Sequence, residues 1–195
     1  MATKKSGMGL GQKIKSALTS PSQLFNAVKG EKGFKTPLTY YAVLALVSSI
    51  LSALVSAYIS NPVLPKVVYS SSLIVLSIVV SWIASFIVAF IFVAIVHVFV
   101  YLLGGKGGYL QTYKAYVYGM TPSLMLGWLP FVNIIVALYS GLYLFPKGMS
   151  ILQNMGFGRA LAAVLLPIII ISLIMVALFF AFLSVFLSGA GLPVA

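Results

Sequence analysis

The chain has 195 residues, of which 62% are hydrophobic and 7% are charged, and its mean hydropathy is +1.14. A soluble domain of this length needs a charged surface, so the composition excludes one and indicates a membrane protein. Twelve residues are Lys or Arg against a single acid, Glu31, which gives a formal net charge of +11. The basic residues lie before and between apolar runs of membrane length, which favours contact with anionic lipid over nucleic acid.

The first 36 residues are predicted to form a basic cytoplasmic segment that contains an interfacial amphipathic helix. Ser20 and Pro21 are a favourable helix start, and Leu24, Phe25 and Val28 then share one helical face. Such a helix fits the membrane surface, apolar side down, and it equally fits a docking site on the transmembrane bundle. Five lysines are expected to contact lipid headgroups, each contributing about 1 kcal/mol: Lys13, Lys15, Lys29, Lys32 and Lys35.

Two long apolar segments follow. The first, 38–59, has the length of one bilayer crossing. The second, 67–103, contains no Gly, Pro, Asn or charged residue that could turn a hairpin, so we predict one long tilted helix. Both carry small residues at four-residue spacing, which lets another helix approach closely. These residues are Ser48, Ser52 and Ser56 in the first segment, and Ser77, Ser81 and Ser85 in the second.

The stretch 109–130 differs from the other apolar segments because tyrosines, hydroxyls, glycines and a tryptophan interrupt it. We predict a third membrane helix over 110–129 and, after Pro130, a fourth over 131–145. Both are shorter than the roughly 20 residues that a full crossing needs, so this hairpin either recruits interfacial turns or is re-entrant. The other helices are expected to pack around it. Residues 146–159 are predicted to be a loop, and a fifth helix, kinked by Pro167, spans 160–187.

The distribution of charge sets the predicted orientation. With five membrane segments and a cytoplasmic N-terminus, eleven basic residues lie inside and only Lys66 lies outside. Splitting the second segment in two would move four of those basic residues outside, and the positive-inside rule rejects that arrangement. The predicted fold is therefore an all-α polytopic membrane protein with five transmembrane helices over 37–188. Its C-terminal tail, 189–195, lies on the side of the membrane opposite the cytoplasm.

The sequence offers no set of residues for acid–base, metal or cofactor chemistry. The one acid lies before the first membrane segment, there is one histidine, and there is no cysteine. We therefore expect no enzyme activity, no cofactor and no metal site. His97 and Ser85 are the candidate polar residues within the membrane. For His97 we expect a neutral imidazole that shares a hydrogen bond with a neighbouring helix, and a gating or sensing role is the alternative.

The hairpin holds the candidate binding residues. In one interpretation these residues line a path for a neutral or anionic solute. In the other they are structural: the tyrosines form an interfacial aromatic belt and Asn133 caps the turn. The candidates are Tyr116, Gly119, Thr121, Pro122, Asn133, Tyr139 and Tyr143.

The run from 104 to 167 resembles the membrane domain of the Ypt-interacting-protein (Yip) family, in particular its compact archaeal and bacterial members. The matching residues are the Gly-rich loop before Tyr109, then Tyr116, Gly119, Thr121 and Pro122, the Leu129-Pro130-Phe131 run with Asn133, Gly148-Met149, and the 160–163 run that leads into Pro167. Pro21 and Phe25 extend the resemblance upstream.

The resemblance implies five transmembrane helices with a cytoplasmic N-terminus, the topology already predicted from charge. It also implies a role in vesicle budding or membrane organisation, and association with prenylated Rab-type GTPases and with other family members. The N-terminal region here is short and basic rather than long and acidic, which argues against GTPase binding.

We therefore predict a non-enzymatic, multi-pass membrane protein that organises membrane or recruits partner proteins. It would reside in the cell membrane of a prokaryote or an endomembrane of a eukaryote. We expect it to contact anionic lipid, to self-associate through its small-residue ridges and to bind no nucleic acid. The alternative is a small channel or transporter that uses the hairpin.

Overall fold

The computed structural model describes residues 8–58 and 71–189, and within them it is helical throughout, with no strand. Lys66 and the tail beyond Gly189 are not among the described residues. Two short helices come first, α1 (Leu10–Thr19) and α2 (Pro21–Val28). Pro21 is the first residue of α2, as predicted, although the Ser20 side chain makes no capping hydrogen bond.

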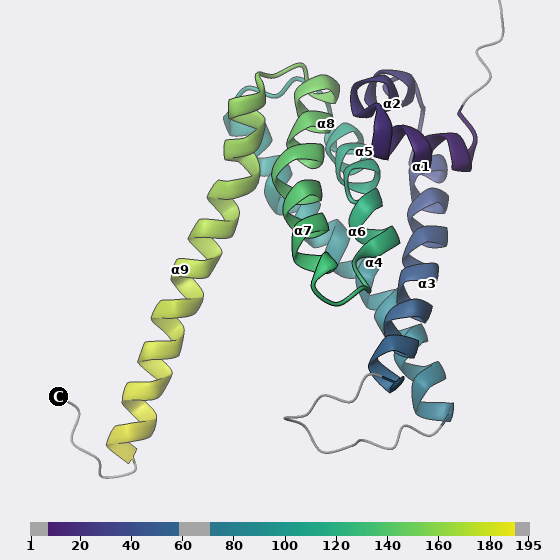
Figure 1. Ribbon diagram of the computed structural model, residues 1–195. Coiled ribbons are helices and arrows are strands. Elements are labelled where there is room, and N and C mark those ends of the chain that lie inside the picture. The colour runs from purple at the N-terminus through teal and green to yellow at the C-terminus, as the bar shows by residue number, and fades with distance from the viewer. Residues whose placement is uncertain (1–7, 59–70, 190–195) are drawn as a thin grey trace, which may run out of the picture.

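The apolar face of α2 is docked on protein. Leu24, Phe25 and Val28 are all buried, and α2 packs against α8 (Phe145–Leu152). The contact is close at Gly148, where an added Cβ atom would lie 2.5 Å from the Phe25 ring. The sequence allowed this helix to lie on the membrane surface or to dock on the bundle, and the structure has it docked on the bundle. The helix α1 runs crosswise to the long helix that follows (Figure 1).

Three long helices form the frame of the molecule: α3 (Lys35–Tyr58), α4 (Ser71–Leu102) and α9 (Phe157–Gly189). Each is long and apolar enough to cross a membrane, and so is the continuous helical stretch from 132 to 152. Four candidate spans are thus present in the described part of the chain. The prediction of one unbroken second helix is confirmed over α4. Its 32 residues reach about 48 Å, well beyond the roughly 30 Å of a hydrocarbon core.

The hairpin differs from its prediction in both arms. The expected helix over 110–129 is wrong, because the structure has α5 (Tyr109–Gly119) and α6 (Thr121–Leu126) with a break at Met120. Pro122 explains the break, since it has no amide hydrogen and favours the first turn of a new helix.

The predicted loop over 146–159 is wrong in its first half. The second arm runs through α7 (Val132–Leu138) and a π-helical turn, η1 (Tyr139–Leu144), directly into α8. The wider π-helical turn lets the helix continue past Pro146, because hydrogen bonds there reach back five residues, as from the Phe145 amide to the Ser140 carbonyl. The second arm is therefore longer than expected.

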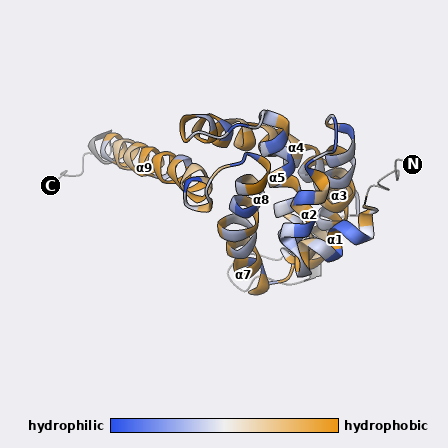
Figure 2. Ribbon diagram, turned by 90° about the horizontal axis from the view of Figure 1, so that it is seen from above, coloured by the Kyte–Doolittle hydropathy of each residue, from blue (hydrophilic) through white to orange (hydrophobic). Residues whose placement is uncertain are grey.

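The packed core lies at the end of the molecule that carries α1 and α2. The buried residues of α4 fall in its C-terminal half, from Ala89 to Val100, whereas Val75 and Val88 are exposed. Likewise α9 buries Ala160, and its residues from Leu173 to Phe182 are exposed. The distal half of α9 leans away from the bundle (Figure 1), and hydrophobic residues cover it on all visible sides (Figure 2).

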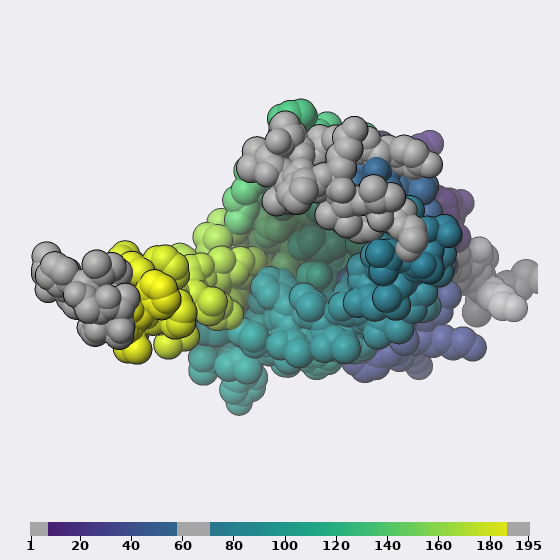
Figure 3. Space-filling model, turned by 90° about the horizontal axis from the view of Figure 1, so that it is seen from below, coloured from purple at the N-terminus to yellow at the C-terminus, as the bar shows by residue number. Residues whose placement is uncertain are grey.

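The hairpin occupies only part of the height of the molecule. The turn between α6 and α7 lies well short of the far ends of α3, α4 and α9 (Figure 1). Seen from that far end, the surface is hollowed between α4 and α9, with the hairpin at the bottom of the hollow (Figure 3). The described part of the protein is therefore bulky at one end and open at the other.

Candidate functional site

A buried polar network joins the N-terminal helices to the hairpin. Lys13 of α1 forms an ion pair with Glu31, with Nζ 2.5 Å from Oε1. The Tyr118 hydroxyl of α5 donates to Glu31 Oε2 at 2.6 Å, and the Lys13 ammonium donates to the same hydroxyl at 3.0 Å. The ammonium also lies 4.9 Å from the centroid of the Tyr118 ring. The one acid of the chain is thus paired in the interior, where low dielectric strengthens each interaction.

A second lysine lies beside this network. Lys114 of α5 is fully buried, and its ammonium donates to the carbonyls of Val28, Lys29 and Glu31 at 2.8, 3.1 and 3.2 Å. These carbonyls end α2, so Lys114 caps the C-terminus of that helix and complements its dipole. Burial lowers the Lys114 pKa, and the nearby carboxylate of Glu31 opposes that shift.

Tyr118 is placed to remain a neutral donor. Its ring is buried, and burial together with its bond to Glu31 raises the pKa of the phenol. The hydroxyl therefore keeps its proton and donates to the carboxylate. Together with the ion pair, this bond fixes α1 and the segment after α2 on α5.

Two of the lysines that the charge count placed on the cytoplasmic side have buried side chains. The prediction that Lys13 contacts lipid headgroups is wrong, because its side chain is 4% exposed and paired with Glu31. Lys114, counted among the cytoplasmic charges, is also buried. The other four predicted headgroup contacts have exposed side chains, although Lys29 Nζ also donates to Asn154 at 2.7 Å: Lys15, Lys29, Lys32 and Lys35.

His97 belongs to a separate polar chain at the junction of α4 and α5. Its Nδ1 lies 2.8 Å from the Thr112 hydroxyl, which also accepts a hydrogen bond from Gln153 Nε2 at 2.8 Å. The Gln153 side chain in turn accepts from the Gly107 amide at 2.6 Å. The histidine thus shares a hydrogen bond with a neighbouring helix, as expected, although the partner is a threonine. This chain holds the glycine-rich loop against α8.

The hairpin candidates divide into two groups. Thr121 and Pro122 are buried, and the Thr121 hydroxyl lies 2.9 Å from that of Tyr40 on α3. Tyr116 packs edge-on against Phe145. A Cβ atom at Gly119 would lie 2.9 Å from the Phe145 Cα, so this glycine permits the close approach of α5 and α8.

The remaining candidates face away from the interior. Tyr139 and Tyr143 stack on each other and are 38% and 44% exposed. Asn133 lies at the exposed start of α7, where its Oδ1 accepts from the Ile134 amide at 2.8 Å. The seven candidates therefore do not converge on one cavity.

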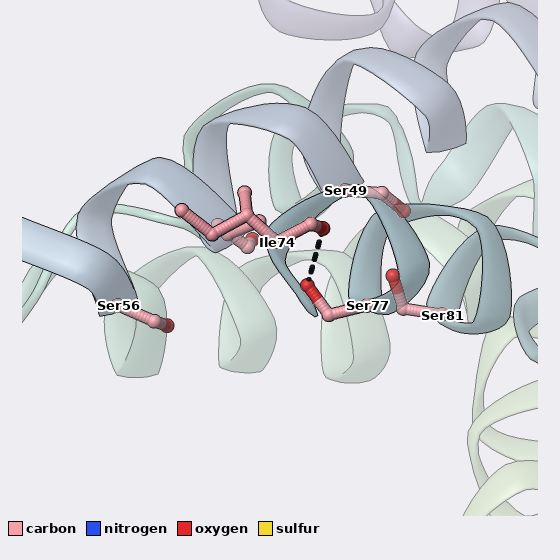
Figure 4. A pocket seen from close by; sticks show the side chains of 7 residues that line it. Ser49, Ser56, Ile74, Ser77 and Ser81 are labelled. Carbon is pink, nitrogen blue, oxygen red and sulfur yellow. Dashed lines mark hydrogen bonds between the residues drawn. The ribbon is translucent and has the colours of Figure 1, made fainter. Parts of the chain in front are cut away.

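The serine ridges of α3 and α4 meet, but they leave space between them. A cavity of about 250 Å³ is lined by five serines, Ser49, Ser52, Ser56, Ser77 and Ser81, together with Ala53 and Ile74 (Figure 4). The Ser77 hydroxyl donates to the Ile74 carbonyl at 2.7 Å, and Ser81 bonds Ile78 in the same way. Ser85 likewise donates to Trp82 of its own helix. These hydroxyls are satisfied locally, as is common for serine in helices.

The described residues contain no group of three or more His, Cys, Asp or Glu side chains that could hold a metal ion. The ion pair of Lys13 and Glu31 with Tyr118 has no nucleophile beside it and is enclosed by packed side chains. What it does is hold two parts of the chain together. Sequence reasoning missed this network and the role of Gln153. The available signal was Lys114, an isolated charge within an apolar segment, and a single acid in a chain of twelve cations.

Comparison with protein-family models gives a match to the Yip1 domain, over residues 15–180. The matched region begins within α1, after Lys13, and ends in α9, so it contains Glu31 and Tyr118 of the buried network, the hairpin and most of each long helix. Comparisons with curated proteins and with solved structures gave no match.

Proposed function

Since this chain belongs to the Yip1 domain family, we propose that it is a non-enzymatic multi-pass membrane protein that shapes its membrane. The observation that carries the proposal is the short, densely packed hairpin at one end of a long helical frame. We further propose that the hairpin is re-entrant and enters from the cytoplasmic side. Three features support this placement: the residues of the turn, the width of the molecule in each leaflet and the positions of its charges.

The turn of the hairpin has the properties of a segment inside hydrocarbon. Apart from Asn133, whose side chain accepts from the Ile134 amide, its exposed residues are apolar, with Phe131 88% exposed and Ile134 and Ile135 beside it. Backbone amides of the turn bond to carbonyls of the turn itself, including Gly127 to Ser123 and Asn133 to Leu129. Non-helical backbone needs such internal partners wherever water is absent. A turn at the water surface would need neither feature.

The second arm has enough length to cross a membrane, but part of that length is used in the protein core. Residues Phe145, Met149 and Leu152 of α8 are buried against α2 and α5 rather than available to lipid. The remainder, α7 and η1, is 13 residues from Val132 to Leu144, or about 20 Å of helix. That remainder is too short for a roughly 30 Å hydrocarbon core.

A re-entrant hairpin makes the protein wider in one leaflet. The cytoplasmic half contains α3, α4, α9 and both arms of the hairpin, with α1 and α2 beside them (Figure 1). Beyond the turn the described chain consists of the ends of α3, α4 and α9, which enclose the hollow in Figure 3. An inclusion that displaces more area in one leaflet than in the other favours a membrane that is convex on the wider side.

The orientation follows from charge. With the N-terminus in the cytoplasm, the exposed Lys15, Lys32, Lys35 and Lys106 all lie on the cytoplasmic side, as the positive-inside rule requires. Because α3, α4 and α9 cross the bilayer and the hairpin returns, the C-terminus lies on the other side. The parity equals that of five crossings. Membership of the compact prokaryotic type and homo-oligomerisation are part of the same proposal, although the serine ridges of α3 and α4 face each other within the chain.

Recruitment of partner proteins is compatible with this role, whereas solute transport through the hairpin has no support from the geometry. A path would need Tyr116, Thr121 and Asn133 to line one continuous polar space. Thr121 is instead buried against Tyr40, and Asn133 is exposed at the turn.

Reconstitution into liposomes tests the proposal. We expect vesicle diameter, measured by cryo-electron microscopy, to fall as the protein-to-lipid ratio rises, while efflux of trapped neutral and anionic solutes stays at the rate of protein-free vesicles. Unchanged diameters together with rapid, selective efflux that Asn133→Leu abolishes would contradict the proposal and favour a channel.

A further inference from the structure

A second apolar surface of α1 is only partly covered by the described chain. The side of α1 that faces the bundle carries Lys13 and Ala17, both buried. The adjoining side carries Leu10, Ile14 and Leu18 at four-residue spacing: Leu10 is 43% and Leu18 46% exposed, whereas Ile14 is half-buried against the core. We propose that α1 lies in the headgroup region of the cytoplasmic leaflet and inserts this Leu10–Ile14–Leu18 stripe among the acyl chains.

The position of α1 fits this role. The helix runs crosswise to α3 near the end at which α3 begins (Figure 1). Since α3 is a membrane span, α1 lies approximately along the membrane plane at one surface. A helix in that orientation, with a narrow apolar stripe and polar residues opposite, is typical of interfacial helices. On the other side of α1, the exposed Lys15 and Thr19 point to the aqueous side.

The buried network fixes which face of α1 is turned to the membrane. Lys13 cannot rotate away from Glu31 and Tyr118 without leaving a buried charge unpaired. With that face held on α5, the stripe is held beside it and Thr19 is held away. The ion pair therefore positions the helix for insertion, whereas headgroup contact by Lys13 is excluded by its burial.

The charges of the N-terminal segment favour an anionic leaflet as the occupant. The single acid of the chain is paired with Lys13, so the exposed charged side chains of the described residues up to Lys35 are all positive: Lys15, Lys29, Lys32 and Lys35. Anionic lipid attracts such a surface, and a second copy of this chain carries the same charge and is repelled. The stripe is also only three side chains wide, far below the roughly 800 Å² per partner of a stable protein interface.

The inference deepens the proposed function, because a helix inserted at this surface widens the cytoplasmic half further. It rests on that proposal only for the identity of the leaflet. Leu24, Phe25 and Val28 of α2, which the sequence suggested as the inserting face, are buried on α8. The inserting helix is thus α1 rather than α2.

Nitroxide labels on single cysteines test the inference, and the chain contains no native cysteine to interfere. The variants are Leu18→Cys and Leu10→Cys on the stripe, with the exposed neighbour Thr19→Cys as the matched control. Each labelled full-length protein is reconstituted into vesicles of phosphatidylcholine with phosphatidylserine. Collision rates of the label with oxygen, which concentrates in hydrocarbon, and with a water-soluble nickel chelate are then compared.

We expect the oxygen-to-nickel ratio to favour oxygen at positions 10 and 18 and nickel at position 19. Preference for nickel at all three positions would place α1 in water and overturn the inference. Protection of positions 10 and 18 from both reagents would show that protein covers the stripe, which also overturns it. A failure here leaves the vesicle-diameter result unaffected, so the two proposals are tested separately.

Discussion

The Tyr118 hydroxyl lies 2.6 Å from the Glu31 carboxylate, although 87 residues separate them in the chain. This contact, with Lys13 on the other carboxylate oxygen, ties the N-terminal helices to the hairpin. The hairpin in turn packs on α4 and α9 through α5 and α8. One acid thus connects the N-terminal helices with the hairpin.

Removing the charge of Glu31 should loosen this connection. Glu31→Gln leaves Lys13, 4% exposed, as an unpaired buried cation, and breaking a buried pair in this way costs about 3 kcal/mol. We expect a lower midpoint of thermal unfolding in mild detergent and faster amide hydrogen exchange in α1 and α2. The exposed Lys15→Gln is the matched control and should change neither.

The same pair allows a double-mutant cycle. Lys13→Met removes the buried cation itself, so no unpaired charge remains when it is combined with Glu31→Gln. The double variant should therefore be less destabilised than the Glu31→Gln variant. The measurement is again the unfolding midpoint. Strictly additive losses would show that the two side chains do not interact and would contradict the described ion pair.

Gly119 is expected to be intolerant of a side chain. The Cβ atom of Gly119→Ala would lie 2.9 Å from the Phe145 Cα and 3.0 Å from its amide nitrogen, and two helix backbones cannot move apart without losing their packing. We expect a loss of about 1–3 kcal/mol, as for other overpacked contacts. Gly158→Ala in α9 is the control, since nothing lies within 4 Å of the added atom. It should be neutral or slightly stabilising.

The hydrogen bonds that join His97, Thr112 and Gln153 allow a separate prediction. Thr112→Val removes the hydroxyl shared by His97 and Gln153 and leaves the half-buried imidazole and the buried amide without that partner, at a cost of about 1–3 kcal/mol. Because Gln153 also holds the Gly107 amide, we expect faster hydrogen exchange in the glycine-rich loop. Thr39→Val, at an exposed position of α3, should leave that exchange unchanged.

The frame of the protein was predictable because it depends on length and hydropathy alone. The unbroken α4 followed from the absence of a turn residue, and the short hairpin followed from the spacing of its apolar runs. The course of the second arm past Pro146 was not predictable, because it depends on a π-helical turn that no local sequence pattern indicates. The expectation that proline ends a helix fails where the hydrogen bonds have already shifted by one residue.

The buried network was beyond sequence reasoning for a different reason. The basic residues look alike in sequence, and only tertiary packing separates Lys13 and Lys114, which are buried, from Lys15 and Lys32, which are exposed. A rule that counts charges by side of the membrane does not distinguish buried lysines from exposed ones. The pairing of Glu31 needed the three-dimensional contact.

The depth of Phe131 tests the central claim, that the hairpin turns inside the bilayer and makes the protein wider on one side. The measurement is oxygen and nickel accessibility of a nitroxide on Phe131→Cys in liposomes, with Gly108→Cys at the exposed start of α5 as the surface control. We predict strong oxygen preference at position 131 and nickel preference at position 108. Nickel preference at both positions would show that the turn reaches water on the far side, and the proposed wedge would be contradicted.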